Sequence, residues 1–295
     1  MSQFLQAAAY GVVQGGVLAL VAVGFSLVWG VMNVINLSHG AFAVAGAYFA
    51  WQLNLRLGLD PFLAIPIVAV AMFGVGYAVQ RGLINLVINA PIFLTLLLTF
   101  GLSLVILNGL QLLFTADDRT IDTTYALESF AIGGVNIPYG RLGAFFLALL
   151  ITFALAAVMT RTRLGHAIGA TGMDRGAARL MGIRARHIYA VTFGIAAGLA
   201  GVAGTMIATV GSFNPTTTPG QLTLDAFVIS VLGGLGNTYG ALVGGLVFGI
   251  AESLGGLLLT GTWVNAIAMA VLIATLIIRP SGLIGKAQYS GRVEV

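Results

Sequence analysis

The N-terminal part of the chain contains a long apolar run, AAAYGVVQGGVLALVAVGFSLVW, at residues 7–29. About 20 such residues, each rising about 1.5 Å along a helix, cross the hydrocarbon core of a bilayer. Comparable segments recur along the chain at 37–52, 62–79, 92–114, 142–160, 189–211, 225–256 and 263–279. We therefore predict an all-α fold, a polytopic transmembrane helical bundle of about eight hydrophobic segments with broken or re-entrant elements, forming a single transmembrane domain over residues 1–295.

The composition points to the same class of protein. Hydrophobic residues make up 59% of the 295 positions and charged residues only 7%. A soluble globular protein has about 25% charged residues, so this composition indicates an integral membrane protein. The 41 glycines agree with that class, because small residues allow transmembrane helices to approach one another closely. The sequence has no cysteine, which excludes disulfides, thiolate chemistry and iron–sulfur ligation.

Charged residues are unevenly distributed between two loops. The segment 161–187 contains a single acidic residue, Asp174, and its arginines are Arg161, Arg163, Arg175, Arg179, Arg184 and Arg186. By the positive-inside rule this loop lies in the cytoplasm. The segment 115–141 is richer in acidic residues and is separated from the basic loop by one predicted span. We therefore expect 115–141 to lie outside.

The C-terminal tail is basic too, with Lys286 and Arg292 against one glutamate, and the same rule predicts that it is cytoplasmic. Eight single crossings, however, place the tail outside. The 225–256 segment is long for one span and contains GGLGNTYG at 233–240. A cytoplasmic tail therefore favours a split of that segment into two elements.

The basic loop contains a short helical pattern, MDRGAARLM, at residues 173–181. Asp174 near its start and Arg179 toward its end suit the helix dipole, and Gly182 is placed to end it. A solvated basic loop that serves only to set topology is the simpler interpretation. A structured helix held between two spans is harder to explain in that way.

Several stretches resemble a known family. The segment GAARLMG (176–182) has the spacing of the EAA-x-x-x-G signature of ATP-binding-cassette (ABC) importer permeases, although Gly176 stands where that signature has glutamate. Three further motifs resemble the permeases of branched-chain amino acid ABC importers, and they occur in the expected order: GVMNVINLSHGAFAVAGAY (30–48), SVLGGLGNTYGALVGGLVFGIAESL (230–254) and RPSGLIGK (279–286). The resemblance extends over nearly the whole chain.

The resemblance implies a permease subunit that moves branched-chain or related small amino acids across a bacterial inner membrane. The implied partners are a second, related permease subunit, two ABC ATPase subunits, an extracytoplasmic solute-binding protein and membrane lipid, with no nucleic acid. ATP and Mg²⁺ would be used by the ATPase subunits, and this chain itself would bind no cofactor and no metal.

The residues agree on one point independently. A P-loop needs a glycine-rich run that ends in Lys and Ser or Thr, and the single lysine, Lys286, is followed by Ala287. The sequence also offers no arrangement of residues typical of a catalytic site, so we expect no enzyme activity. The alternative interpretation is a stand-alone ion-coupled secondary transporter or channel for a small polar solute.

In the ABC importers that the chain resembles, a short cytoplasmic coupling helix fits a groove on the ATPase subunit. Carried over to this sequence, that helix lies in the loop 161–187. The expected contact residues are Asp174, Arg175, Ala177, Ala178, Arg179 and Gly182.

The polar stretch NVINLSHG, residues 33–40, interrupts the first two apolar runs. We predict a break that doubles as a helix start, capped by Ser38 or Asn36. HGAFAVAGA (39–47) and YGALVGGLV (239–247) are similar, and paired interruptions of this kind often surround a midplane site in transporters. The candidate residues for a translocation path or helix break are Asn33, Asn36, Ser38, His39, Asn237 and Glu252.

Within this set, a structural role is favoured for NVINLSHG over direct contact with a substrate. His39 has no neighbouring Cys, His or acid that would suggest metal ligation. Asp225 and Glu252 are acids within or beside apolar segments, where charge is costly unless it faces a cavity or a partner. An interfacial position is favoured for Asp225, and for Glu252 a site and a span boundary are equally well supported.

Overall fold

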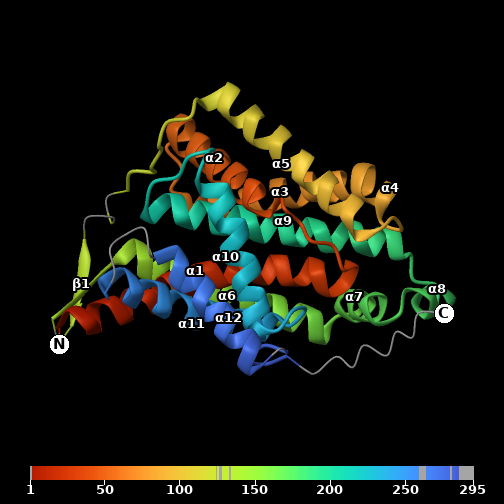
Figure 1. The fold of residues 1–295 in the computed structure, drawn as a ribbon. Helices are drawn as coiled ribbons and strands as arrows, with labels where there is room; N and C mark the ends of the chain where they lie inside the picture. Colours follow the sequence, from red (N-terminus) through yellow and green to blue (C-terminus); the bar gives the residue numbers. More distant parts are fainter. Residues whose placement is uncertain are drawn as a thin grey trace.

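The computed structural model describes residues 2–123, 125, 128–132, 134–258, 264–279 and 281–285. Over these residues the chain forms helices joined by loops, together with one β-hairpin (Figure 1). The main helices are α1 (Ser2–Met32), α2 (His39–Leu57), α3 (Pro61–Val79), α5 (Ile92–Phe114), α6 (Tyr139–Arg161), α9 (Ala185–Val210), α10 (Thr218–Gly233), α11 (Thr238–Leu258) and α12 (Val264–Ile278). The predicted all-α transmembrane bundle is confirmed.

Smaller elements lie at the two ends of the bundle. A π-helical turn, η1 (Gln80–Ile84), and α4 (Asn85–Val87) extend α3, and α7 (Arg163–Met173) and α8 (Arg175–Leu180) occupy the basic loop. At the opposite end, β1 (Ser129–Ile132) pairs antiparallel with β2 (Val135–Pro138).

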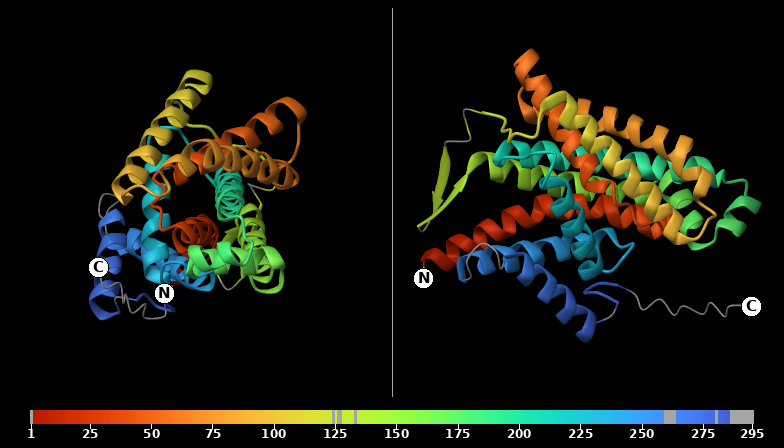
Figure 2. Two further views of the ribbon diagram at one scale, coloured as in Figure 1. Left: turned by 90° about the vertical axis from the view of Figure 1, so that its right-hand side faces the viewer. Right: turned by 45° about the horizontal axis from the view of Figure 1, so that its top comes forward.

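The core is built around α1 and α9. In each of them more than four-fifths of the most apolar stretch is buried, against 11% for α5. Figure 2 (left) looks along α1 and shows the other helices arranged around it. Six helices of the described chain are long and apolar enough to cross a membrane. The peripheral helices therefore present apolar faces to lipid or to another subunit.

Glycines allow α1 and α11 to pack closely against each other. A Cβ atom built on Gly15 would lie 2.4 Å from the carbonyl oxygen of Gly245, and one on Gly249 would lie 2.3 Å from the carbonyl oxygen of Gly11. Early residues of α1 thus meet late residues of α11, so the two helices are antiparallel. Gly245 and Gly249 therefore serve helix packing.

The long apolar segment 225–256 forms two helices, as the basic C-terminal tail led us to expect. α10 ends at Gly233 and α11 begins at Thr238, with Gly234 and Gly236 at positive φ in the turn between them. The backbone N–H of Leu283 donates to the carbonyl of Leu232 over 2.8 Å. The residues after α12 therefore lie beside this turn. Lys286 and Arg292 fall outside the described residues.

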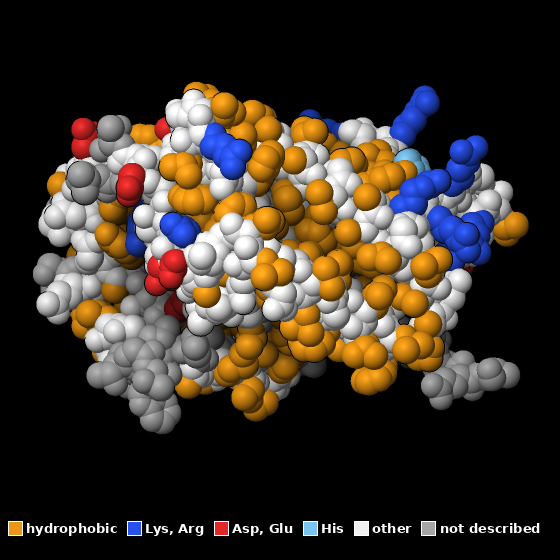
Figure 3. Space-filling view, turned by 90° about the horizontal axis from the view of Figure 1, so that it is seen from above, with side chains coloured by type: hydrophobic (Ala, Val, Ile, Leu, Met, Phe, Trp, Pro, Cys, Tyr) orange, Lys and Arg blue, Asp and Glu red, His pale blue; other side chains and the backbone are white. Residues whose placement is uncertain are grey.

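Contacts place this turn at the same end as the basic loop. Gly236 packs against Gly30 near the end of α1, and Gly30 in turn packs against Gly172 of α7. The hairpin lies at the other end, where Gln6 of α1 exchanges two hydrogen bonds with the backbone of Asn136 (2.7 and 2.8 Å). In Figure 3 the acidic side chains gather toward the hairpin end and the largest group of basic ones toward the other. Which end is cytoplasmic stays a prediction from the charge rule.

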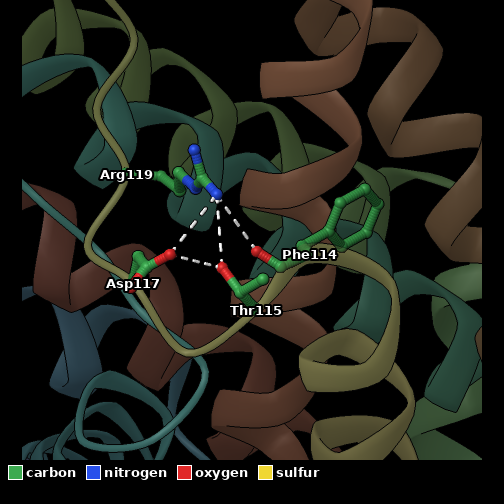
Figure 4. Close-up of polar contacts among 4 residues, drawn as sticks. All are labelled: Phe114, Thr115, Asp117 and Arg119. Carbon is green, nitrogen blue, oxygen red and sulfur yellow. Dashed lines mark hydrogen bonds and ion pairs between the residues drawn. The ribbon is translucent and has the colours of Figure 1, made fainter.

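The acidic loop lies over the hairpin end of the bundle, where polar contacts hold it in place. Figure 4 shows Arg119 donating to the carbonyl of Phe114 and the hydroxyl of Thr115, both at 3.3 Å, and facing Asp117 at 3.8 Å. Arg119 also exchanges two backbone hydrogen bonds of 2.9 Å with Phe213, which joins this loop to the α9–α10 connection. An exposed ion pair contributes little, so the backbone pairing is the stronger tie.

The same loop also contacts the start of α3. The phenol of Tyr125 donates to the carboxylate of Asp60 over 2.8 Å, and Asp60 also caps α3 by accepting from the N–H of Phe62. Burial, together with the hydrogen bond to Asp60, raises the pKa of Tyr125 above its usual value. The phenol therefore stays protonated and remains a donor throughout the neutral range.

Candidate functional site

The basic loop is almost wholly helical. Asp174 is the N-cap of α8, and its carboxylate accepts from the N–H groups of Gly176 (2.7 Å) and Ala177 (3.0 Å). Gly182 has φ +81 and follows the end of the helix. The predicted helix with Asp174 at its start and Gly182 at its end is thus confirmed.

A second helix, α7, precedes α8 and was not predicted from the sequence. The signal was present but weak: Gly165, Ile168 and Thr171, the buried residues of α7, recur every three positions on one face. The hydroxyl oxygen of Thr162 caps this helix by accepting from the N–H of Gly165 over 3.1 Å.

Large apolar side chains are exposed on α8 and at the residues that flank it, and we call this surface, formed by Met173, Leu180 and Met181, the outer face of α8. Met173 and Leu180 are each 90% exposed and Met181 is 82% exposed. α8 lies at the end of the molecule beyond the long helices (Figure 1). Exposed apolar groups that cluster in this way mark contact sites for other proteins. Sequence reasoning missed all three residues, because a Leu or Met in a helix is usually assigned to the inside.

The predicted contact residues divide between two faces of this segment. Asp174, Ala177, Arg179 and Gly182 are exposed beside the apolar side chains. Ala178 is only 4% exposed and packs toward its own chain, contrary to the sequence-based expectation for that residue. Arg175 is half-buried.

Arg175 faces inward and holds α8 against the rest of the subunit. Its guanidinium donates to the side-chain oxygen of Asn89, in the connection between α4 and α5. The same group lies 5.6 Å from the ring centre of Tyr189 in α9, within the range of a cation–π contact. Arg175 therefore links α8 to two other parts of the chain.

Two further contacts tie the start of α9 to the end of α3 and to the segment that follows it. The phenol of Tyr77 lies 3.1 Å from Nδ1 of His187. The side-chain amide of Asn85 donates to the carbonyl of Arg186 over 3.3 Å. A π-helical turn, often found at functional sites, lies between Tyr77 and Asn85. We refer to the contacts of Arg175, Tyr77 and Asn85 as the clamp.

The stretch 33–38 is the predicted break between the first two apolar runs. It contains no helix, and Asn33 has φ +52. α2 then begins at His39, whose Nε2 lies 2.9 Å from the carbonyl oxygen of Val21. Because Val21 is in the middle of α1, α2 begins deep inside the bundle and not at its end. The break is therefore a re-entrant connection, in agreement with the predicted fold class.

The predicted cap is different in detail. Ser38 makes no side-chain cap to α2, and instead its hydroxyl donates to the side-chain oxygen of Asn36 over 2.6 Å. That oxygen also accepts the N–H of Ser38 at 3.1 Å. Asn36 therefore organises the turn, and Ser38 is its partner.

Hydroxyl groups of distant helices satisfy the remaining donors. Thr99 of α5 accepts the N–H of Leu37 (3.2 Å), and Thr223 of α10 accepts the N–H of Gly40 (2.9 Å). Asn36, Ser38 and His39 are all buried. The hydrogen bonds of the Asn36 side-chain oxygen, of Ser38 and of His39 Nε2 are all made within this chain, which favours an organising role, whereas Nδ1 of His39 is buried without a partner among the described residues.

His39 sits in an aromatic environment at the start of α2. Its ring meets Phe25 edge-on at 5.7 Å, and a side chain at Gly24 would lie 3.1 Å from the ring. The hydrogen bond to the carbonyl of Val21 agrees with a structural histidine.

Asn237 and Glu252 lie near opposite ends of α11. The side-chain oxygen of Asn237 accepts the N–H of Gly240 (3.1 Å) and its amide donates to the carbonyl of Ile284 (3.2 Å). Asn237 thus caps α11 and holds the tail at the basic end. Glu252 lies near the other end of α11, so the structure does not bring the six candidates together in one site.

The first prediction concerns Asn36. In Asn36→Leu the N–H and hydroxyl of Ser38 lose a buried acceptor, which costs about 1–3 kcal/mol for each unsatisfied group. We expect a loss of folded subunit, measured by size-exclusion chromatography of detergent extracts. Asn108→Leu is the matched control, since Asn108 is exposed on α5 and bonds only to a carbonyl of its own helix. Normal folding with lost uptake would instead assign Asn36 to direct substrate contact.

The second prediction concerns Asn237. Asn237→Ala removes the cap of α11 and the tie to Ile284, and losing a cap costs about 1 kcal/mol. Hydrogen exchange at the amides of Leu283 and Ile284 should accelerate by about fivefold. Asn237→Asp retains the acceptor for Gly240 but loses the donor, so it should release the tail without uncapping α11. Unchanged exchange in both variants would contradict the assigned role.

Comparisons with known proteins agree with this architecture. The family described as "Branched-chain amino acid transport system / permease component" matches residues 7–278. The high-affinity branched-chain amino acid transport system permease protein BraD of Pseudomonas aeruginosa is 30% identical, over 97% of this chain and 97% of its own. LivH of Salmonella typhimurium, a permease protein of the same description, is 29% identical over 97% and 96%. A probable LivH of Methanocaldococcus jannaschii is 28% identical over 93% and 90%.

None of the solved structures matches the chain. The family match covers nearly all of the described helices, from α1 to the end of α12. The chain therefore belongs to the family of branched-chain amino acid transport permeases.

Proposed function

We propose that the chain is the membrane permease subunit of an ABC importer for branched-chain or related small amino acids. In this role it forms the path across the membrane together with a second permease subunit. ATP hydrolysis, with Mg²⁺, takes place in two partner ATPase subunits. The observation that carries the proposal is the outer face of α8, where exposed Leu180 and Met181 stand at the end of a segment clamped to the spans.

The outer face of α8 suits a groove on a partner ATPase. It combines exposed apolar side chains with the exposed charges of Asp174 and Arg179, and interfaces commonly consist of an apolar core and a polar rim. A helix of this size fills a groove through a few central side chains, which contribute most of the binding energy. Leu180 is the principal anchor in this proposal.

The clamp supplies the route by which motion of α8 reaches the membrane. Arg175 links α8 to Asn89 and Tyr189, and Tyr77 links the end of α3 to the start of α9. A shift of the ATPase subunits thus moves α3 and α9 together as rigid elements. Alternating access requires two alternative packings of these helices. Nucleotide bound to the partner ATPase shifts the equilibrium between them.

The proposed surroundings follow from the same arrangement. The basic end faces the cytoplasm and the ATPase subunits, and the covered hairpin end faces an extracytoplasmic solute-binding protein. The exposed apolar face of α5, only 11% buried in its central stretch, is available for the second permease subunit or for lipid. We place the chain in the inner membrane of a bacterium, with no cofactor of its own.

Reconstitution tests this function directly. Proteoliposomes that contain the chain, the second permease, both ATPases and the binding protein should take up leucine only with ATP and Mg²⁺ present. Liposomes that contain the chain alone should take up none under a sodium or proton gradient. Uptake by the chain alone under an ion gradient would overturn the proposal in favour of a secondary transporter.

A further inference from the structure

A cavity of about 250 Å³ lies between α1, α6, α9, α10 and α11 toward the hairpin end of the bundle. Its polar lining includes Gln14, Arg141, Asp225 and Glu252, and Val17 and Ile207 belong to its apolar wall. Pockets for drug-sized ligands have volumes of about 300–1,000 Å³. This cavity therefore suits a smaller molecule.

The three charged groups of the cavity have few partners in the chain. Among the described residues, Asp225 makes no hydrogen bond or ion pair, and Glu252 accepts only a long bond of 3.3 Å from Gln14. Arg141 faces the ring of Tyr10 at 4.7 Å. All three are half-buried. Charges withdrawn from water are costly unless they are paired, so these groups leave interactions open to a ligand.

The charged groups and the apolar wall of the cavity indicate the kind of ligand. Two carboxylates and one guanidinium line the cavity, so acidic groups are in excess. An ammonium group supplies three N–H donors and positive charge, and a guanidinium binds a carboxylate through two parallel hydrogen bonds. The apolar wall suits a short aliphatic group. These features are complementary to one molecule that carries an ammonium group, a carboxylate and a small apolar side chain.

We propose that this cavity is a binding site for a free zwitterionic amino acid with a short aliphatic side chain. The ammonium group lies between Asp225 and Glu252, and the carboxylate is held by Arg141. The site belongs to this chain alone and needs neither the second permease subunit nor the ATPases. The cavity and its charges carry the site, and the choice of an aliphatic amino acid as its ligand rests on the proposed function.

Equilibrium binding to the full chain in phosphatidylcholine nanodiscs tests the site, because that lipid has no primary amine. The probes are L-leucine, isoamylamine (ammonium only) and isovalerate (carboxylate only). Leucine should bind most tightly, and isoamylamine more tightly than isovalerate. Asp225→Asn and Glu252→Gln should each weaken leucine binding at least about tenfold. Arg141→Met should weaken leucine but not isoamylamine.

Controls separate the site from general effects. Asp122→Asn neutralises an exposed acid in the 115–123 loop and should leave binding unchanged. Thermal unfolding of each variant in the same discs verifies that the bundle is intact. Failure of leucine to bind the wild-type chain, or equal binding by folded Asp225→Asn, would overturn the proposal. Neither result bears on the ATP-driven uptake test above, so the two proposals fail separately.

A lipid headgroup is the other source of a neighbouring ammonium and anion. Discs that contain phosphatidylethanolamine distinguish it from a free amino acid. Unchanged leucine affinity in such discs supports the proposed site. Loss of leucine binding there assigns the cavity to the headgroup and overturns the amino-acid assignment.

Discussion

Leu180→Asp should abolish most ATP-driven uptake, with a fall of at least about tenfold, while the subunit stays folded in the membrane. Leu180 is 90% exposed, so the free subunit loses no packing when the side chain changes. In the complex, however, an aspartate at the centre of an apolar groove is desolvated without a partner. The measurements are leucine uptake, ATP hydrolysis and co-purification of the ATPase subunits.

Two variants make this result interpretable. Leu180→Met conserves the apolar contact and should retain uptake, since exchanges of Leu and Met are tolerated at packed positions. Arg163→Asp places a new acid in the same loop, on the first turn of α7 and away from the outer face of α8. It should have a smaller effect than Leu180→Asp. Wild-type uptake in Leu180→Asp would remove α8 from the coupling mechanism.

Gly15→Leu should prevent the bundle from assembling. Even the first carbon of a side chain at this position would lie 2.4 Å from the backbone oxygen of Gly245. Overpacking normally costs about 1–3 kcal/mol, and here the obstacle is backbone that no rotamer change can move aside. We expect little folded subunit in detergent extracts.

The matched control is Gly74→Leu in α3, where an added Cβ atom meets nothing within 4 Å. Leucine has the higher helix propensity, so this variant should fold at least as well as the wild-type chain. If Gly15→Leu gave as much folded subunit as Gly74→Leu, the close approach of α1 and α11 would be contradicted. The measurement is the same for both variants, the monodisperse fraction in size-exclusion chromatography.

Features with a local chemical cause could be predicted from the sequence. Asp174 caps α8 through its own nearby N–H groups, and Gly182 ends that segment with a positive φ, so both follow from neighbouring residues. The separation of α10 and α11 likewise follows from the glycines at 233–236. The family resemblance was confirmed over most of the chain.

Features that depend on distant contacts could not be predicted. Ser38 or Asn36 was expected to cap α2, but Thr223, far along the chain, accepts from the start of that helix. The depth of His39 depends on Val21, and the inward position of Ala178 depends on packing by its own subunit. The cavity is likewise invisible in the sequence, since Arg141, Asp225 and Glu252 come from three different helices. The periodicity and spacing of residues in the sequence do not show which distant side chains come into contact.

The start of α2 also constrains how the protein is made. Backbone N–H groups left without acceptors in the hydrocarbon cost several kcal/mol each, and those of Leu37 and Gly40 depend on the hydroxyls of Thr99 and Thr223. The ribosome has not yet synthesised Thr223 when residues 33–57 reach the membrane. The second segment therefore cannot take its final position as it is inserted, and it must wait in water or at the interface until α10 arrives.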